Sequence, residues 1–292
     1  LIKKYNKSKD KKFYSLVGEP FTNEDIIAGI ETLLSGRITM SSITKRFEEN
    51  FAKFVGSKHA LMVNSGSSAN LLAFFSSINP KNYMRLHKND ECLIPAICWS
   101  TSLWPIVQAG LKPKFVDVSL DDFNFDLKKL EKKITKKTKA ILPIHWSGKI
   151  CDMDEILKIS KLHKIPIVED SCHGILATRK KKFAGTFGDF GCFSLHPLKN
   201  LNVWGDGGFV IVKNKKNFEK IKLLRNHGLV GRNKNLLFGY NSRLDTVQAC
   251  VANHLLKKIK FITKKRIENA EYLDKKLKNN FNLILKQKEY FS

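Results

Sequence analysis

The sequence predicts an α/β fold, in which a mostly parallel sheet carries helices on both faces. The main observation is that short apolar runs of strand length alternate with longer segments of helical apolar spacing. Such alternation is typical of βαβ units. In addition, 42% of the 292 residues are hydrophobic, which is enough to form a large core. Polar segments follow several of the apolar runs, at the place where open α/β sheets bind ligands.

Two helices are expected before the sheet. Residues 23–36 combine Asn23 as an N-cap, helical apolar spacing and a terminal glycine, and residues 43–56 repeat that pattern. Strands are then expected at 59–64, 92–95, 114–118, 140–145 and 165–170. Helices are expected from Ser67, after Trp99, and at 126–134 and 153–164. Residues 191–195 and 208–212 indicate further short strands, and a long lysine-rich helical region begins at Leu244.

Lys199 is unusual among the many lysines of this chain. It lies in FSLHPLKNLNVWGDGG, between an apolar run and a glycine-rich turn, whereas most other lysines lie in polar runs. An ammonium held near apolar surface has a lowered pKa, which favours the free amine that attacks a carbonyl. The sequence therefore predicts a Schiff-base lysine. The alternative is a lysine at a strand end whose ammonium reaches solvent.

The segment NSGSSAN places Gly66, Ser67 and Ser68 between an apolar run and a helical pattern. Backbone N–H groups and hydroxyls at the start of a helix form a phosphate-binding cradle. The same residues also serve as ordinary caps and turns.

Two further segments contain candidate ligand contacts. Asp170 ends an apolar strand, where a carboxylate meets ligands in open sheets, and His173 follows three residues later. The alternative for Asp170 is a helix N-cap. Trp99, in PAICWSTS, lies between a strand and a helix. It is either a core residue or a flat platform for an aromatic cofactor.

A phosphate cradle, an aromatic platform, a strand-end carboxylate and a desolvated lysine are together what pyridoxal 5′-phosphate (PLP) requires. The chain resembles the DegT/DnrJ/EryC1/StrS sugar-nucleotide aminotransferases, PLP enzymes of fold type I. The resemblance runs from about Glu24 to about Lys260 through ordered motifs: NSGSSAN, PAICWSTS, GLKPKFVDV, PIHWSGKICDMDEI, VEDSCHG, GTFGDFGCFSLHPLKN, GDGGFV, RNHGL and GYNSRLD.

The resemblance implies a role for each candidate residue. Lys199 would hold PLP covalently and, once released, shuttle a proton, while Asp170 would pair with the pyridinium nitrogen. The other roles fall into three groups: phosphate contacts from Gly66, Ser67, Ser68 and Ser194; stacking by Trp99; and contact with the ring's O3′ side by His173. His145, His196 and Arg225 lie near these motifs without an assigned role.

Asn241, in GYNSRLD, matches a position that reaches the cofactor phosphate of the neighbouring subunit, which implies a homodimer with shared sites. Its alternative is the N-cap of a helix beginning near Ser242. His173 has the alternative of a satisfied core histidine.

The implied reaction is transamination, in which an amino acid, expected to be glutamate, donates its amino group to a nucleotide-linked keto-deoxysugar. One alternative is a PLP-dependent sugar dehydratase, whose members resemble this chain around NSGSSANLL but carry histidine at the position of Lys199. Another is a non-catalytic basic binding module.

The composition limits the function classes. The net charge is +25, from 52 basic and 27 acidic residues, but the lysines are spread along the chain, so no specific nucleic-acid partner is expected. The six cysteines include no C-x-x-C pair, which favours reduced thiols, no metal and a cytoplasmic protein. No transmembrane segment or secretory signal is expected either.

Three parts are predicted along the chain. Residues 1–55 form a basic tail and two helices, 56–240 the large PLP-binding α/β domain, and 241–292 long helices with the start of a small domain. The chain begins with Leu1 and ends soon after FNLILK, an expected strand. We therefore expect most of the C-terminal small domain to be missing from it.

Overall fold

The computed structural model describes residues 21–78 and 87–277. The predicted basic tail and the strand predicted near the C-terminus lie outside these residues. The described helices that come before β5 in the chain are α2 (Asn23–Leu34), α3 (Ser42–Phe54), α4 (Gly66–Ile78), α5 (Ser100–Gln108), α6 (Leu127–Lys132) and α7 (Met153–His163). The later helices are α8 (Lys215–Leu224) and α9 (Thr246–Leu277).

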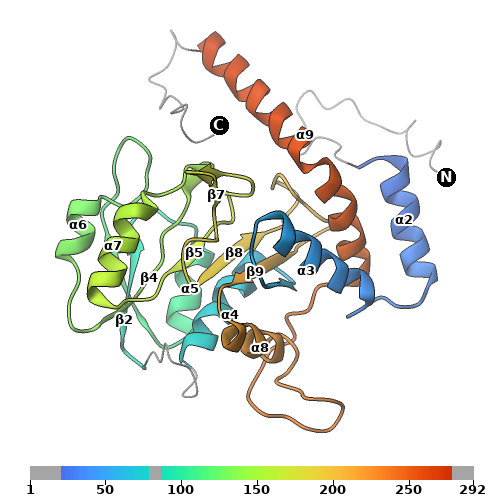
Figure 1. Cartoon of the computed structure of the whole chain (residues 1–292), viewed down its shortest axis with the longest axis horizontal. Helices are drawn as coiled ribbons and strands as arrows, with labels where there is room; N and C mark the ends of the chain where they lie inside the picture. Colours follow the sequence, from blue (N-terminus) through green and yellow to red (C-terminus); the bar gives the residue numbers. More distant parts are fainter. Residues whose placement is uncertain (1–20, 79–86, 278–292) are drawn as a thin grey trace.

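The strands form a four-stranded and a three-stranded sheet, which isolated bridges join edge to edge, and a separate hairpin (Figure 1). They are β1 (Ala60–Val63), β2 (Glu91–Pro95), β3 (Lys112–Val116), β4 (Thr138–Ile141), β5 (Val168–Asp170), β8 (Phe190–Ser194) and β9 (Gly208–Val212). Their pairings give the order β3-β2-β4 and β5-β8-β9-β1, and the bridge between Ile141 and Ile167 joins the two sets. Among these described strands, β9 alone runs opposite to the others, so its pairings with β1 and β8 are antiparallel and the remaining pairings are parallel.

Side chains alternate across the sheet and build a core on each face. In β9, Val210 and Val212 pack with α4, α5 and α8, whereas Phe209 and Ile211 pack with α3 and α9. In β2, Cys92 and Ile94 face the α4 and α5 side, and Leu93 packs with α6 and α7. Helices therefore cover both faces, as the period of two along a buried strand requires.

The carboxyl ends of the parallel strands gather the predicted motifs at one edge of the sheet. Asp170 ends β5, Ser194 ends β8, and Trp99 follows β2. A glycine is required where α4 approaches this edge, because a Cβ on Gly66 would lie 2.8 Å from Ser194 Cβ and 2.9 Å from Cys172 Sγ. The close approach brings the start of α4 against the end of β8.

Several local features differ from the prediction. Thr22, rather than Asn23, is the N-cap of α2, and it forms a capping box with Asp25. Helix α8 is an addition to the predicted elements. It follows Asn214, whose side chain accepts the N–H groups of Lys216 and Asn217. The hairpin of β6 (Thr178–Arg179) and β7 (Lys182–Phe183) was not predicted either. Among the described helices, none combines the length and the apolar character needed to cross a membrane.

Candidate active site

A cavity of about 470 Å³ opens at the carboxyl edge of the sheet. Seven of the nine predicted site residues line it: Gly66, Ser67, Trp99, Asp170, His173, Ser194 and Lys199. They come from four separate parts of the chain, and the topology brings them together. Ser68 and Asn241 do not line the cavity.

The Asp170 carboxylate is 4% exposed and is held by three donors. Asn70 Nδ2 and Ser102 Oγ donate to Oδ2 at 3.0 and 2.7 Å, and the Cys172 N–H donates to Oδ1 at 3.1 Å. Turns, rather than a helix, follow Asp170, so the N-cap alternative is wrong. A carboxylate with this many donors keeps a fixed orientation toward the cavity.

Lys199 lies in a turn beyond the end of β8, half-buried in the cavity wall. The backbone N–H of Lys199 donates to the His196 carbonyl at 2.8 Å, and Asn202 Nδ2 donates to the backbone carbonyl of Lys199 at 3.1 Å. Burial lowers the pKa of Lys199, and the nearby Cys172 and Asp170 partly offset this effect. The free amine is therefore more accessible near neutral pH than in an exposed lysine.

This desolvation has a measurable consequence for stability. Lys199→Met is expected to raise the free energy of unfolding of the cofactor-free protein at pH 7, because the native state then no longer buries an ammonium. The pKa of Lys199 is lowered from 10.5, so the wild-type native state binds fewer protons than the unfolded state between its folded pKa and pH 10.5. The free energy of unfolding of the wild type therefore rises with pH across that window. The difference in this free energy between Lys199→Met and the wild type should become smaller there.

Urea unfolding of both proteins at pH 7 and at successively higher pH measures this difference. Lys128→Met, at an exposed position of α6, is the matched control and should show no such trend. An equal, pH-independent effect of both substitutions would mean that Lys199 is solvated like the surface lysines.

Trp99 and His173 both border the cavity rather than the core. Trp99 is 69% exposed at the start of α5, so the core-residue alternative is wrong. His173 is also exposed, and its Nδ1 accepts the Ser147 N–H at 3.3 Å, which excludes the core-histidine alternative. Partial burial and the Lys199 ammonium lower the pKa of His173, which favours the neutral ring at pH 7.

The start of α4 and the end of β8 form the predicted phosphate cradle. The first N–H groups of a helix have no acceptor four residues earlier within it, so those of Gly66 and Ser67 are available at the cavity. The Ser68 N–H instead donates to Ser65 Oγ at 3.0 Å, and Ser65 itself lines the cavity. Ser194 contributes its hydroxyl, which accepts the His196 N–H at 3.3 Å.

A buried hydrogen-bonded pair lies directly beside Asp170. Glu169 and His145 are both 0% exposed, and His145 Nε2 lies 2.9 Å from Glu169 Oε2. The N–H groups of Gly185, Phe187 and Gly188 donate to the same carboxylate at 2.8, 2.7 and 2.5 Å. His145 Nδ1 accepts the Cys151 N–H, so the proton of a neutral ring is on Nε2 and is donated to Glu169.

Asn241 lies on the surface, where it accepts a hydrogen bond from Arg243 Nε at 3.1 Å. Helix α9 begins only at Thr246, so the alternative of Asn241 as its N-cap is wrong. The contact with a neighbouring subunit stays a prediction.

Comparison with known proteins places these features in a family. Residues 21–289 match the DegT/DnrJ/EryC1/StrS aminotransferase family. The chain belongs to this family.

Relatives of this DegT-family chain include two kinds of enzyme. The chain is 35% identical over 281 residues to the GDP-4-keto-6-deoxy-D-mannose 3-dehydratase of Escherichia coli O55:H7, and this match covers 88% of the chain and 71% of the relative. It is 32% identical over 274 residues to the UDP-4-amino-4,6-dideoxy-N-acetyl-beta-L-altrosamine transaminase of Campylobacter jejuni, covering 91% of this chain and 70% of the relative.

A crystal structure of GDP-4-keto-6-deoxymannose-3-dehydratase with a trapped PLP-glutamate geminal diamine superposes on the DegT-family chain with a TM-score of 0.88 at 33% identity. The match covers 95% of this chain and 76% of that structure. The prediction of a PLP-dependent transferase fold of type I is therefore confirmed.

The cavity of this DegT-family protein fits PLP on its own geometry. The α4 N-terminus with Ser194 suits a phosphate, the exposed face of Trp99 suits a flat ring, and Asp170 and Lys199 line the same cavity. Asn70 Oδ1, also buried at this cavity, has no hydrogen-bond donor among the described residues. Among those residues, no three histidine, cysteine, aspartate or glutamate side chains cluster as metal ligands.

Proposed function

We propose that this protein is a PLP-dependent aminotransferase that transfers an amino group from glutamate to a nucleotide-linked keto-deoxysugar. The observation that carries this proposal is the joint placement of Lys199, Asp170 and the α4 N-terminus around one cavity. PLP supplies an electron sink when it is bound. The family includes enzymes that act on nucleotide-linked sugars and is PLP-dependent.

In this proposal Lys199 and Asp170 have separate roles in the reaction. The amine of Lys199, with its lowered pKa, holds the cofactor covalently and later moves the proton at the substrate carbon that carries the amino group. Asp170, fixed by Asn70, Ser102 and the Cys172 N–H, keeps a proton on the ring nitrogen of the cofactor.

The remaining wall positions the cofactor. Gly66, Ser67 and Ser194 bind its phosphate, with Ser68 behind them in the first turn of α4. Trp99 provides the stacking face. The ring of His173 would face the O3′ side of the cofactor, and because its Nδ1 accepts the Ser147 N–H, its Nε2–H would donate a hydrogen bond there.

A PLP-dependent 3-dehydratase is the second candidate, because dehydratases are among the most similar relatives and solved structures. The dehydratase relatives are expected to carry histidine at the position of Lys199, and a histidine cannot form the covalent link to the cofactor. The presence of Lys199 therefore favours transamination.

The test incubates the complete protein and PLP with a panel of nucleotide-linked 4-keto-6-deoxysugars and glutamate, and mass spectrometry detects the products. An amino sugar formed with one equivalent of 2-oxoglutarate supports transamination. A product that has lost its 3-hydroxyl and contains no new nitrogen supports the dehydratase. A protein that neither acquires visible absorbance with PLP nor forms a product is the non-catalytic binding module.

We also propose a homodimer with shared sites. The cavity wall residues Trp99 and Leu198 are 69% and 41% exposed, which suits coverage by a second subunit. Asn241→Ala is expected to weaken PLP retention in the purified protein and to leave the dimer intact. Cofactor retained on gel filtration and the mass from light scattering measure the two effects. A monomeric protein with full activity would contradict the shared site.

A further inference from the structure

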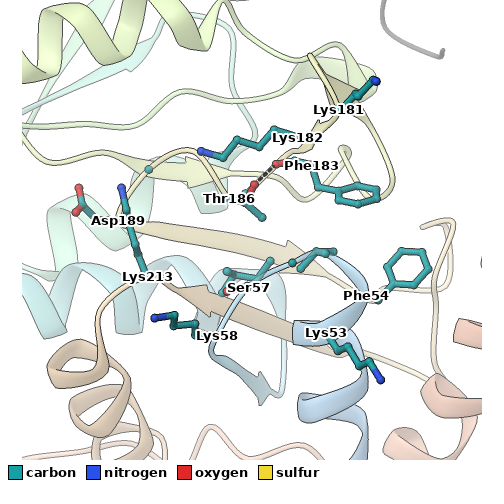
Figure 2. Close-up of a pocket in the computed structure, with 15 residues that line it drawn as sticks. Lys53, Phe54, Ser57, Lys58, Lys181, Lys182, Phe183, Thr186, Asp189 and Lys213 are labelled. Atoms are coloured by element: carbon teal, nitrogen blue, oxygen red, sulfur yellow. Dashed lines mark hydrogen bonds between the residues drawn. The ribbon is translucent and has the colours of Figure 1, made fainter.

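A second hollow of about 620 Å³ lies at the other edge of the sheet (Figure 2). It is lined by the turn after α3, the β6–β7 hairpin, the loop into β8 and the end of β9. Asp189 immediately precedes β8 and lines this hollow, whereas Ser194 at the other end of β8 lines the cavity with Lys199. The two hollows are therefore separated by the length of one strand.

The lining of this second hollow is strongly cationic. It contains five lysines and a single carboxylate, that of Asp189. Figure 2 shows the side chains of Lys58, Lys182 and Lys213 pointing to the side of the hollow where Asp189 lies, whereas Lys53 and Lys181 point away from it. Three ammonium groups thus face one region that holds one carboxylate.

The three lysines are available to a ligand. Within residues 21–78 and 87–277, none of them takes part in an ion pair. Lys182 Nζ lies 4.7 Å above the Phe187 ring, which fixes its position. Burial and the neighbouring Lys213 ammonium lower the pKa of Lys182, so an anion between these two lysines would relieve their repulsion.

The other side of the hollow is aromatic. Phe54, at the end of α3, and Phe183, in β7, line it with ring centroids 5.8 Å apart. Ammonium groups at one side suit phosphate oxygens, and aromatic faces at the other suit a flat ring. The volume is within the range of small-molecule sites.

We propose that this hollow binds a nucleoside diphosphate, with its phosphates at Lys58, Lys182 and Lys213 and its base at Phe54 and Phe183. The site is separate from the cavity that contains Lys199, so it does not depend on the aminotransferase activity.

Isothermal titration calorimetry of the complete protein at physiological ionic strength tests the proposal, with ADP and inorganic pyrophosphate as probes. The double variant Lys182→Ala/Lys213→Ala should weaken ADP binding at least about tenfold, because it removes two charge-assisted contacts. The matched control Lys53→Ala/Lys181→Ala changes the net charge equally, at lysines that point away, and should change the affinity less than about twofold.

Phe54→Ala distinguishes the two parts of the ligand. It should weaken the binding of ADP and leave that of pyrophosphate unchanged. If both double variants lose ADP affinity equally, the effect comes from the net charge of the protein and not from this site. If Lys182→Ala/Lys213→Ala binds ADP as tightly as the wild type, the site is excluded. If ADP binds no better than pyrophosphate and Phe54→Ala affects neither, the nucleoside part of the proposal is wrong. Thermal unfolding of each variant verifies that it is folded.

Discussion

Lys199→Ala is expected to abolish the borohydride-reducible covalent link to PLP and to lower turnover by at least about 10²–10⁴-fold. The substitution removes both the amine that holds the cofactor and the group that moves the substrate proton, and a positioned acid–base group alone contributes about that factor. The phosphate contacts, Trp99 and Asp170 remain, so PLP should still bind noncovalently. Mass spectrometry after borohydride reduction and steady-state kinetics measure the two losses.

Two further variants define what Lys199 does. Asp170→Asn should retain the covalent link and lose turnover, because a neutral amide no longer holds a proton on the ring nitrogen. Lys158→Ala, at an exposed position of α7, should change neither property. A reducible link through another lysine in Lys199→Ala, or near-normal transamination, would make Lys199 a structural residue and remove the basis of the proposed function.

Glu169→Ala is expected to destabilise the protein by about 3–5 kcal/mol, the largest stability effect of a single substitution considered for this fold. The carboxylate accepts hydrogen bonds from His145 and three backbone N–H groups, and all four donors would be left without an acceptor in a dry interior. Urea unfolding followed by circular dichroism measures the change in the free energy of unfolding.

Glu155→Ala is the matched control, since the side chain of this glutamate on α7 is 46% exposed and its ion pair in the described structure is with Lys158. Its effect should lie within about 0.5 kcal/mol. Glu169→Gln keeps one carbonyl acceptor and should fall between the two. A change in Glu169→Ala as small as that of the control would show that water readily replaces the carboxylate.

The parts of the site that the sequence predicts are those with a local signature. Asp170 ends an apolar strand, and Lys199 stands between an apolar run and a glycine-rich turn, so each is visible from its neighbours. Asn70 and Ser102 lie in the motifs NSGSSAN and PAICWSTS, but nothing in the neighbouring residues indicates their contact with Asp170. Their contacts with Asp170 span 100 and 68 residues of chain, and such pairing depends on packing rather than on local pattern.

The fold shows the same limit. The alternation of strands and helices predicts the layers, because burial enforces the periods of two and 3.6. It does not predict the reversed direction of β9, which depends on the route of the chain between Ser194 and Gly208. Helix α8 had a usable signal in Asn214 followed by Phe218, Ile221 and Leu224 at helical spacing, with Ile221 and Leu224 fully packed in the core.

The donors that hold Asp170 come from α4, α5 and the turn after β5, and this origin affects how the protein folds. The contact from the Cys172 N–H is local, but those from Asn70 and Ser102 require α4 and α5 to be packed on the sheet, so the carboxylate acquires its full set of donors only after the helices have packed. An unfolded chain then lacks the assembled binding site for the cofactor. The site-specific contacts therefore favour the native state, and to the extent that the cofactor binds only this state, each tenfold rise in free cofactor above its dissociation constant adds about 1.4 kcal/mol to the stability of the whole domain.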